Sequence, residues 1–152
     1  MDNLLKLIEE QILLLELSKT SLQYSFEQTS NILTNTTASN FTLAQQDVLE
    51  AFASRLARTA DILVQKVIKP VHIYESEPNG TVRDMLLLSE KKGIINDAET
   101  LFAIRLFRNE IAHDYLPQSQ LKIAKGCIFF TPTLLKNVDA TIVYTQKYLH
   151  KL

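Results

Sequence analysis

An apolar repeat in the first 33 residues constrains the fold more than any other feature of the sequence. From Asp2 to Leu33, apolar side chains recur at helical spacing, at Leu4, Ile8, Ile12, Leu15, Leu22 and Phe26. An α-helix of 3.6 residues per turn brings all six to one side. The repeat therefore predicts one long helix, and strand signals are scarce in the rest of the chain.

A second long helix is predicted after a short polar break. The break covers residues 34–40, TNTTASN, and ends in residues that favour helix caps. Helical apolar spacing then resumes over about residues 42–69, and Pro70 is expected to close the helix. The following stretch, VHIYESEPNG at residues 71–80, is predicted to be a loop.

Capping residues, glycine and proline define three further helices. Thr81 and Asp84 stand at the N-cap and N3 positions of a capping-box-like pair, and Gly93 is a natural helix end. Asn96 and Glu99 repeat the start signal. The predicted helices span about 82–92, 97 to 113 or 115, and 131–149.

The last predicted helix follows a different kind of segment. KGCIFF, residues 125–130, is expected to be a brief extended connection, after which Thr131 and Pro132 open the helix. The sequence as a whole predicts an all-α, up-and-down bundle of four to five helices. At this length, one domain covering residues 1–152 is the simplest organisation.

The charge balance offers no long-range attraction for nucleic acid. The formal net charge is −1 at pH 7, and the isoelectric point is about 6.3. RNA binding would then depend on a local patch, for which Lys91, Lys92, Arg105 and Arg108 are the candidates. The alternative for the two lysines is that they only favour the C-terminus of their helix.

The N-terminal segment and the single cysteine indicate a cytoplasmic protein. Residues 1–17 are leucine-rich but are interrupted by charged residues, so neither a signal peptide nor a membrane span is expected. Cys127 lies in the apolar run CIFF, which predicts a small buried side chain rather than a nucleophile. With one cysteine, no internal disulfide forms.

The stretch RNEIAHDY, residues 108–115, places polar side chains near the end of an apolar helix. A helical projection puts Arg108 on the same side as Leu101, Ile104, Phe107 and Ile111. An arginine there is either a snorkelling or ion-paired structural residue or a functional group. Tyr115 falls on this side as well.

His113 projects about 140° away from Arg108 on the same helix. It shares a second, partly apolar side with Phe102, Leu106 and Asn109. Two open explanations are a twofold dimer that covers this side and coverage by the first or second helix of the same chain. The other two histidines, His72 in the predicted loop and His150 at the chain end, are expected to be solvated.

The chemistry of these residue types suits cleavage of RNA. Histidine exchanges protons near neutral pH, arginine binds phosphate in a planar fork, and tyrosine can orient either group. A base that removes the 2′-hydroxyl proton and a cation that stabilises the phosphorane suffice, so no metal or other cofactor is required. A simple anion site is the alternative.

Arg108, His113 and Tyr115 fit the pattern R-x4-H-x-Y, which resembles the signature of HEPN domains, and in particular of HepT-like toxins that accompany a small MntA-type nucleotidyltransferase. RDMLLLSEKKGII and LFAIRLFRNEIAHDY are similar in order and spacing to the final helices of that group, and RLARTADILVQKV to its second long helix. The resemblance covers about residues 1–150, with the motif as its specific part.

This resemblance implies a dimer in which two copies of the motif face one groove and form a metal-independent ribonuclease site acting on tRNA or mRNA. Arg108 would hold the scissile phosphate, His113 would act as general acid or base, and Asn109 would orient the histidine or a phosphate oxygen. Tyr115 matches the tyrosine that the nucleotidyltransferase antitoxin adenylylates, which would add bulk and charge where RNA docks.

Two other functions remain open at this point. The chain lacks nucleotidyltransferase motifs of its own, so an antitoxin would be a separate protein. A noncatalytic helical adaptor that binds substrate for, or regulates, such an enzyme is the main alternative. A structural bundle whose polar helix end binds nothing is a weaker one.

Overall fold

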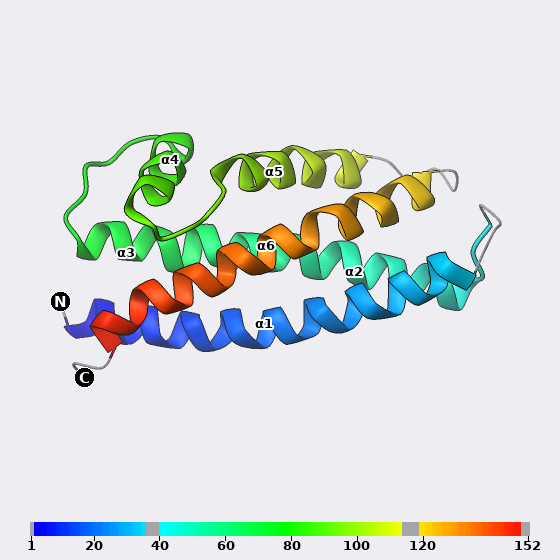
Figure 1. Ribbon diagram of the computed structural model, residues 1–152, viewed down its shortest axis with the longest axis horizontal. Coiled ribbons are helices and arrows are strands. Elements are labelled where there is room, and N and C mark those ends of the chain that lie inside the picture. Colours follow the sequence, from blue (N-terminus) through cyan, green and yellow to red (C-terminus); the bar gives the residue numbers. More distant parts are fainter. Residues whose placement is uncertain (1, 36–39, 114–118, 150–152) are drawn as a thin grey trace.

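The computed structural model describes residues 2–35, 40–113 and 119–149 (Figure 1). All regular elements in these ranges are helices: α1 (Asp2–Asn35), α2 (Leu43–Asp61), the π-helical segment η1 (Ile62–Ile68), α3 (Lys69–Tyr74), α4 (Val82–Lys92), α5 (Ala98–His113) and α6 (Ser119–Leu149). The predicted all-helical bundle is confirmed. None of the described helices is both long enough and apolar enough to cross a membrane.

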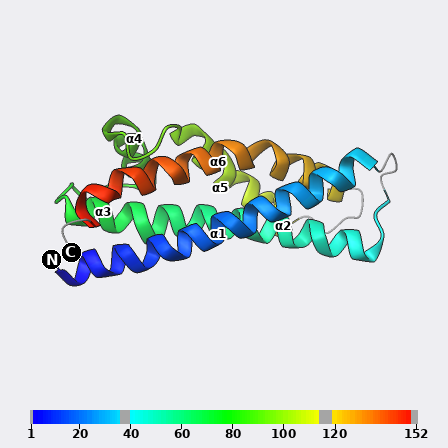
Figure 2. The same ribbon diagram turned by 60° about the horizontal axis from the view of Figure 1, so that its bottom comes forward.

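The helices lie side by side, with α1 and α5 running in one direction and α2–α3 and α6 in the opposite one (Figures 1 and 2). The start of α1 and the end of α6 lie at the same end of the bundle. α1 packs along α2 and η1, and α6 crosses this pair on the side that also carries α4 and α5. The predicted apolar side of α1 forms part of the core. Ile8, Leu15 and Leu22 are fully buried there.

The second long helix does not end at Pro70. α2, η1 and α3 follow one another without a break as far as Tyr74, so the predicted helix end and the first part of the predicted loop are wrong. In the π-helical segment the Lys69 N–H donates to the carbonyl of Val64, five residues back. This wider turn gives room for the proline ring, which has no N–H to place. Pro70 is buried.

The last helix begins earlier than predicted. α6 starts at Ser119 and passes through the segment predicted to be extended, with Pro132 inside the helix. Pro132 is exposed, so its ring is accommodated on the solvent side. Buried side chains continue at helical spacing on both sides of it, at Ala124, Cys127, Thr131, Leu134 and Val138. The continuing burial of this side favours the helix over the break that a proline usually causes.

The predicted caps of α4 are present. The Thr81 hydroxyl accepts from the Asp84 N–H at 3.1 Å, the Asp84 carboxylate accepts from the Thr81 N–H at 3.2 Å, and Gly93 ends the helix with φ of 82°. α5 begins at Ala98, one residue later than predicted, so the cap shifts from Asn96 to the next residue. The Asp97 carboxylate accepts from the Thr100 N–H at 3.2 Å and from its hydroxyl at 2.8 Å, so Asp97 caps this helix.

Candidate functional site

α5 turns one side to the core and carries the first part of the predicted motif on its later turns. Leu101, Ile104 and Phe107 are buried and Ile111 is half-buried, as the helical projection predicts. α5 contacts α2 and α6 through this side. The motif therefore begins on a helix that the core holds in place.

The helical projection puts Arg108 on this side of α5, but its side chain is not buried there. Its side chain is 55% exposed, and its Nη1 lies 3.3 Å from Oδ1 of Asp61 on α2, which is 47% exposed. A long side chain next to a buried face reaches solvent at the edge of that face, which is the snorkelling and ion-paired arrangement. An exposed pair at this distance contributes less than about 1 kcal/mol, so the guanidinium can exchange Asp61 for another anion.

Two hollows adjoin Arg108 along the seam between α2 and α5. The larger is a groove of about 550 Å³, which also reaches the start of α6. The smaller, of about 170 Å³, includes Arg105, Asp61 and Ala60 in its lining. Small side chains on α2, at Ala53, Ala57 and Ala60, leave this seam open. Arg108 lines both hollows, so an anion bound to it would lie beside an apolar groove.

The second side of α5 is largely open. Leu106 is 68% exposed and Asn109 is also exposed. Phe102 is half-buried, and the Arg83 guanidinium of α4 lies 4.8 Å from the centre of its ring. Contrary to one of the two explanations, α1 and α2 thus leave Leu106 uncovered.

The rest of the motif is described only in part. α5 remains helical to His113, so the backbones of Arg108 and His113 are turned about 140° apart around its axis. The His113 side chain, Tyr115 and His150 lie outside the described residues. Arg108 and Asn109 are accordingly the site residues whose surroundings the structure gives.

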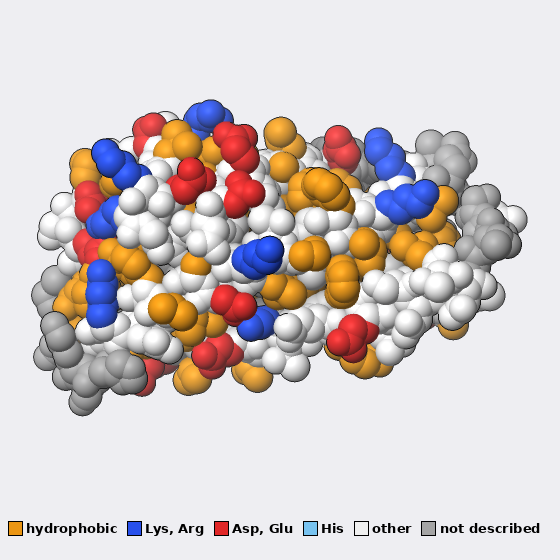
Figure 3. All heavy atoms as spheres, in the orientation of Figure 1, with side chains coloured by type: hydrophobic (Ala, Val, Ile, Leu, Met, Phe, Trp, Pro, Cys, Tyr) orange, Lys and Arg blue, Asp and Glu red, His pale blue; other side chains and the backbone are white. Residues whose placement is uncertain are grey.

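The predicted basic patch is smaller than expected. Lys92 is drawn into ion pairs with Glu75 and Glu77, each with an N–O distance of 2.5 Å. On the face shown in Figure 3, lysine and arginine side chains are interspersed with acidic ones rather than merged into one basic surface. Arg105 and Arg108, which line the same hollow, are the part of the patch that lies at the motif.

The structure also contains a polar cluster that the sequence did not predict. The Glu75 carboxylate at the end of α3 accepts hydrogen bonds from Lys92 of α4 and from the hydroxyls of Tyr144 and Tyr148 of α6. Burial opposes ionisation of Glu75, but the hydrogen bonds from Lys92 and Tyr144 outweigh it and lower the pKa of the carboxyl. The cluster ties three helix ends together. Its signal in the sequence was the spacing of the two tyrosines by one helical turn.

His72 belongs to the same end of the bundle, and the prediction that it is solvated is wrong. It is 6% exposed, and its Nε2 lies 2.7 Å from Oγ of Ser89. Since the Ser89 hydroxyl donates to the Met85 carbonyl, the histidine N–H is the donor to Ser89. Burial lowers the pKa of His72, and the nearby Lys92 lowers it further. His72 is therefore a buried, neutral histidine with a structural role.

Cys127 is fully buried, as predicted, and burial raises the pKa of its thiol to about 12. The thiolate needed of a nucleophile is thereby disfavoured. In the described ranges, no three His, Cys, Asp or Glu side chains lie close enough together to hold a metal ion.

The candidate site thus combines an exposed arginine, an adjoining apolar groove and an open helix side. These features allow binding of a phosphate or another oxyanion, with an apolar group beside it. Comparison of the chain with protein-family models, with curated proteins and with solved structures finds no match.

Proposed function

We propose that this chain is a HEPN-like, HepT-type toxin, a metal-independent endoribonuclease that acts as a homodimer. The observation that carries the proposal is Arg108. Its exposed guanidinium lines a groove of about 550 Å³, and its one ion pair among the described residues is with the half-exposed carboxylate of Asp61. Arg108 precedes His113 and Tyr115 at the R-x4-H-x-Y spacing. Such an arginine can exchange its carboxylate for an RNA phosphate at little cost.

The proposed reaction is an internal transesterification. His113 of one subunit acts as general base and takes the proton of the 2′-hydroxyl, whose oxygen then attacks the adjacent phosphorus. The bond to the 5′-oxygen breaks, this oxygen receives a proton from a general acid, and a 2′,3′-cyclic phosphate remains. Arg108 stabilises the charge that accumulates on the phosphorane oxygens, and Asn109 orients the histidine or a phosphate oxygen.

A dimer is proposed because the motif forms half of a site. Arg108 and His113 diverge by about 140° on one helix, so one subunit alone does not direct both at the same phosphate. The exposed Leu106 and Asn109 make the second side of α5 available to a twofold-related copy. The two motifs would then face one groove.

Regulation by a separate nucleotidyltransferase is part of the proposal. Transfer of AMP to the Tyr115 hydroxyl would place a phosphodiester and an adenosine next to the phosphate-binding arginine. RNA would be excluded by charge and by bulk. Intact mass after incubation with the partner enzyme and ATP tests this step, and Tyr115→Phe is expected to gain no AMP.

The alternative, a noncatalytic adaptor for a nucleotidyltransferase, is favoured by one observation. The ion pairs of Lys92 with Glu75 and Glu77 remove a lysine from the predicted RNA-binding patch in a chain of net charge −1. Stable binding of the partner enzyme, together with no cleavage by the unmodified dimer, would select this function.

The direct test is cleavage of tRNA and mRNA by the purified dimer. Arg108→Ala and His113→Ala are expected to abolish cleavage and growth arrest while the helical circular dichroism and the dimer persist. Lys136→Ala is the matched control, because Lys136 is an exposed cation of α6 that lines neither hollow next to Arg108. Equal cleavage by wild type and His113→Ala would refute the proposal.

A further inference from the structure

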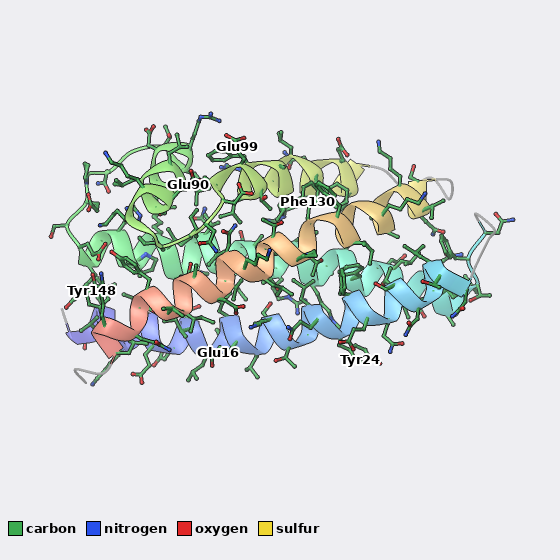
Figure 4. The ribbon with its side chains drawn as sticks, viewed as in Figure 1. Glu16, Tyr24, Glu90, Glu99, Phe130 and Tyr148 are labelled. Carbon is green, nitrogen blue, oxygen red and sulfur yellow. The ribbon has the colours of Figure 1, made fainter. Side chains whose placement is uncertain are left out.

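α1 carries a second apolar surface on the side opposite its core face. Five large side chains form this outer stripe, with exposed fractions of 41% at Leu7, 58% at Leu13, 48% at Leu14, 68% at Leu17 and 58% at Tyr24. At 100° per residue, the centre of the stripe lies about 160° from the buried side of the helix. Figure 4 shows Tyr24 on the lower edge of α1, where the guanidinium of Arg55 on α2 lies 6.0 Å from the centre of its ring.

Such a surface is unusual for a helix that already has a buried face. A surface helix ordinarily has one apolar side and a polar opposite side. Single exposed apolar residues are common, but five along one side of one helix, interrupted only by Glu10 and Ser21 between Leu7 and Tyr24, are of the kind that marks an interaction site. The outer stripe therefore calls for a partner.

The spacing of the outer stripe has the period of a coiled coil. Four of its five residues follow this period: Leu7 and Leu14 occupy a positions of a heptad, and Leu17 and Tyr24 occupy d positions. Leu13 stands at the flanking g position. Ser21 and Gln28 complete the a positions, and Asn3 and Glu10 complete the d positions. A partner helix running along α1 would meet all of them.

We propose that the occupant is α1 of a second copy of this chain, packed antiparallel about a twofold axis. In the register that we propose, the numbers of two facing residues, one from each copy, add up to 31. Every a position of one copy then faces a d position of the other. Leu14 then faces Leu17 of the partner subunit, and Leu7 faces Tyr24 of the partner subunit. The apolar residues of the stripe thus face apolar residues of the same stripe when the second copy runs in the opposite direction.

Charge selects the antiparallel direction. In this register Lys6 and Glu27 of the partner subunit, both at g positions, lie next to each other along the edge of the contact. Glu10 faces Ser21 of the partner subunit, whose hydroxyl can donate to it. A parallel pair in register would instead place the two Glu10 carboxylates against each other. Opposite charges therefore meet in one orientation and like charges in the other.

The contact is small and reversible. The overlap of residues 3–28 is about 38 Å long and about 10 Å wide, or about 400 Å² on each copy. This lies at the low end of specific interfaces, where association is weak and transient. The surface is distinct from the exposed side of α5, so a chain that pairs through both would build assemblies larger than a dimer.

Position-specific cross-linking tests the pairing directly. Leu7→Cys and Tyr24→Cys, mixed and mildly oxidised, are expected to form a disulfide between subunits, a species of twice the 17.3 kDa chain mass. Each variant alone is expected to stay uncross-linked, because two copies of the same position are about 25 Å apart in the antiparallel pair. The buried Cys127 does not compete. Cross-linking of Leu7→Cys alone, or the same yield when Leu43→Cys replaces Leu7→Cys, would overturn the proposal.

Sedimentation measures the strength of the contact, using the Leu106→Glu background to remove pairing through α5. Leu17→Lys is expected to weaken self-association about tenfold or more by placing a charge in the central layer. Lys6→Glu is expected to weaken it and Lys6→Glu with Glu27→Lys to restore it. A background protein that stays monomeric at all concentrations would refute the proposal and assign the stripe to a different protein.

Discussion

Gly126→Ala is predicted to destabilise the protein although it removes a glycine from the middle of a helix. Replacing a mid-helix glycine by alanine ordinarily stabilises by about 0.5–1 kcal/mol. Here a methyl group on residue 126 of α6 would lie 2.5 Å from both Cε2 and Cζ of Phe107. Two carbon atoms at this distance overlap strongly, so the ring or the helix has to move.

The Phe107 ring has little room to yield. It is 8% exposed, and its centre lies 5.3 Å from the centre of the Phe130 ring, which Figure 4 shows between α5 and α6. Overpacking of this kind costs about 1–3 kcal/mol. Against the helix gain, a net loss of about 1 kcal/mol is expected, which lowers the melting temperature by about 2–4 °C for a chain of this size.

Urea unfolding followed by circular dichroism measures this loss, and Phe107→Leu supplies the control. In the Phe107→Leu background the overlap is relieved, so Gly126→Ala is expected to become stabilising. Its effect on the free energy of unfolding is then expected to differ between the two backgrounds by at least about 1 kcal/mol. Stabilisation of the wild type by about 1 kcal/mol would show that the ring yields freely. Phe107 would then not hold α5, and with it Arg108, in a fixed position against α6.

Three further predictions concern buried groups. Because folding lowers the pKa of His72, the unfolded state takes up a proton at a higher pH than the folded state does. The free energy of unfolding is therefore expected to fall as the pH drops below about 6.5, by up to about 1.4 kcal/mol per pH unit. Thermal melts of wild type and His72→Gln at pH 7.5 and 5.5 measure this fall, and equal pH dependence of both proteins would contradict it. Glu75→Gln is expected to cost about 2 kcal/mol at pH 7, because Lys92 loses one of its two charged acceptors and keeps only Glu77. This difference shrinks as the pH falls below 4.5 and through the lowered folded pKa of Glu75. Urea titrations at pH 7 and 3.5 check it, and an equal difference at both pH values would argue against the ion pair. Cys127 is expected to resist thiol reagents in the native protein and to react on unfolding; rapid labelling without denaturant would contradict its burial.

The sequence predicted the helices that carry local signals and misplaced the boundaries that tertiary packing decides. Thr81, Asp84 and Gly93 act through neighbouring backbone groups, so their roles could be predicted from spacing. Pro70 and Pro132 were expected to end or begin helices, but the surrounding helix sides stay buried and outweigh the lost hydrogen bond. The helix propensities of single residues do not include the stabilisation that comes from burying a helix side.

The same distinction applies to the candidate site. The helix of Arg108 and its buried neighbours Leu101, Ile104 and Phe107 followed from periodicity. The ion pairs of Lys92 and the burial of His72 depend on contacts between α3, α4 and α6, which residue spacing along one segment does not reveal. The local sequence pattern thus predicted the helix, whereas contacts between helices determine which charged side chains are left to bind a ligand.

In the proposed dimer, each subunit contributes half of a ribonuclease site. Mixed dimers of Arg108→Ala and His113→Ala test it, because one subunit keeps the histidine and the other keeps the arginine. Random assembly makes half of the dimers mixed, each with one of its two arginine–histidine pairs intact, so RNA cleavage at about a quarter of the wild-type level is expected from two variants that are inactive alone. A mixture as inactive as its components, with mixed dimers shown to be present, would contradict a composite site.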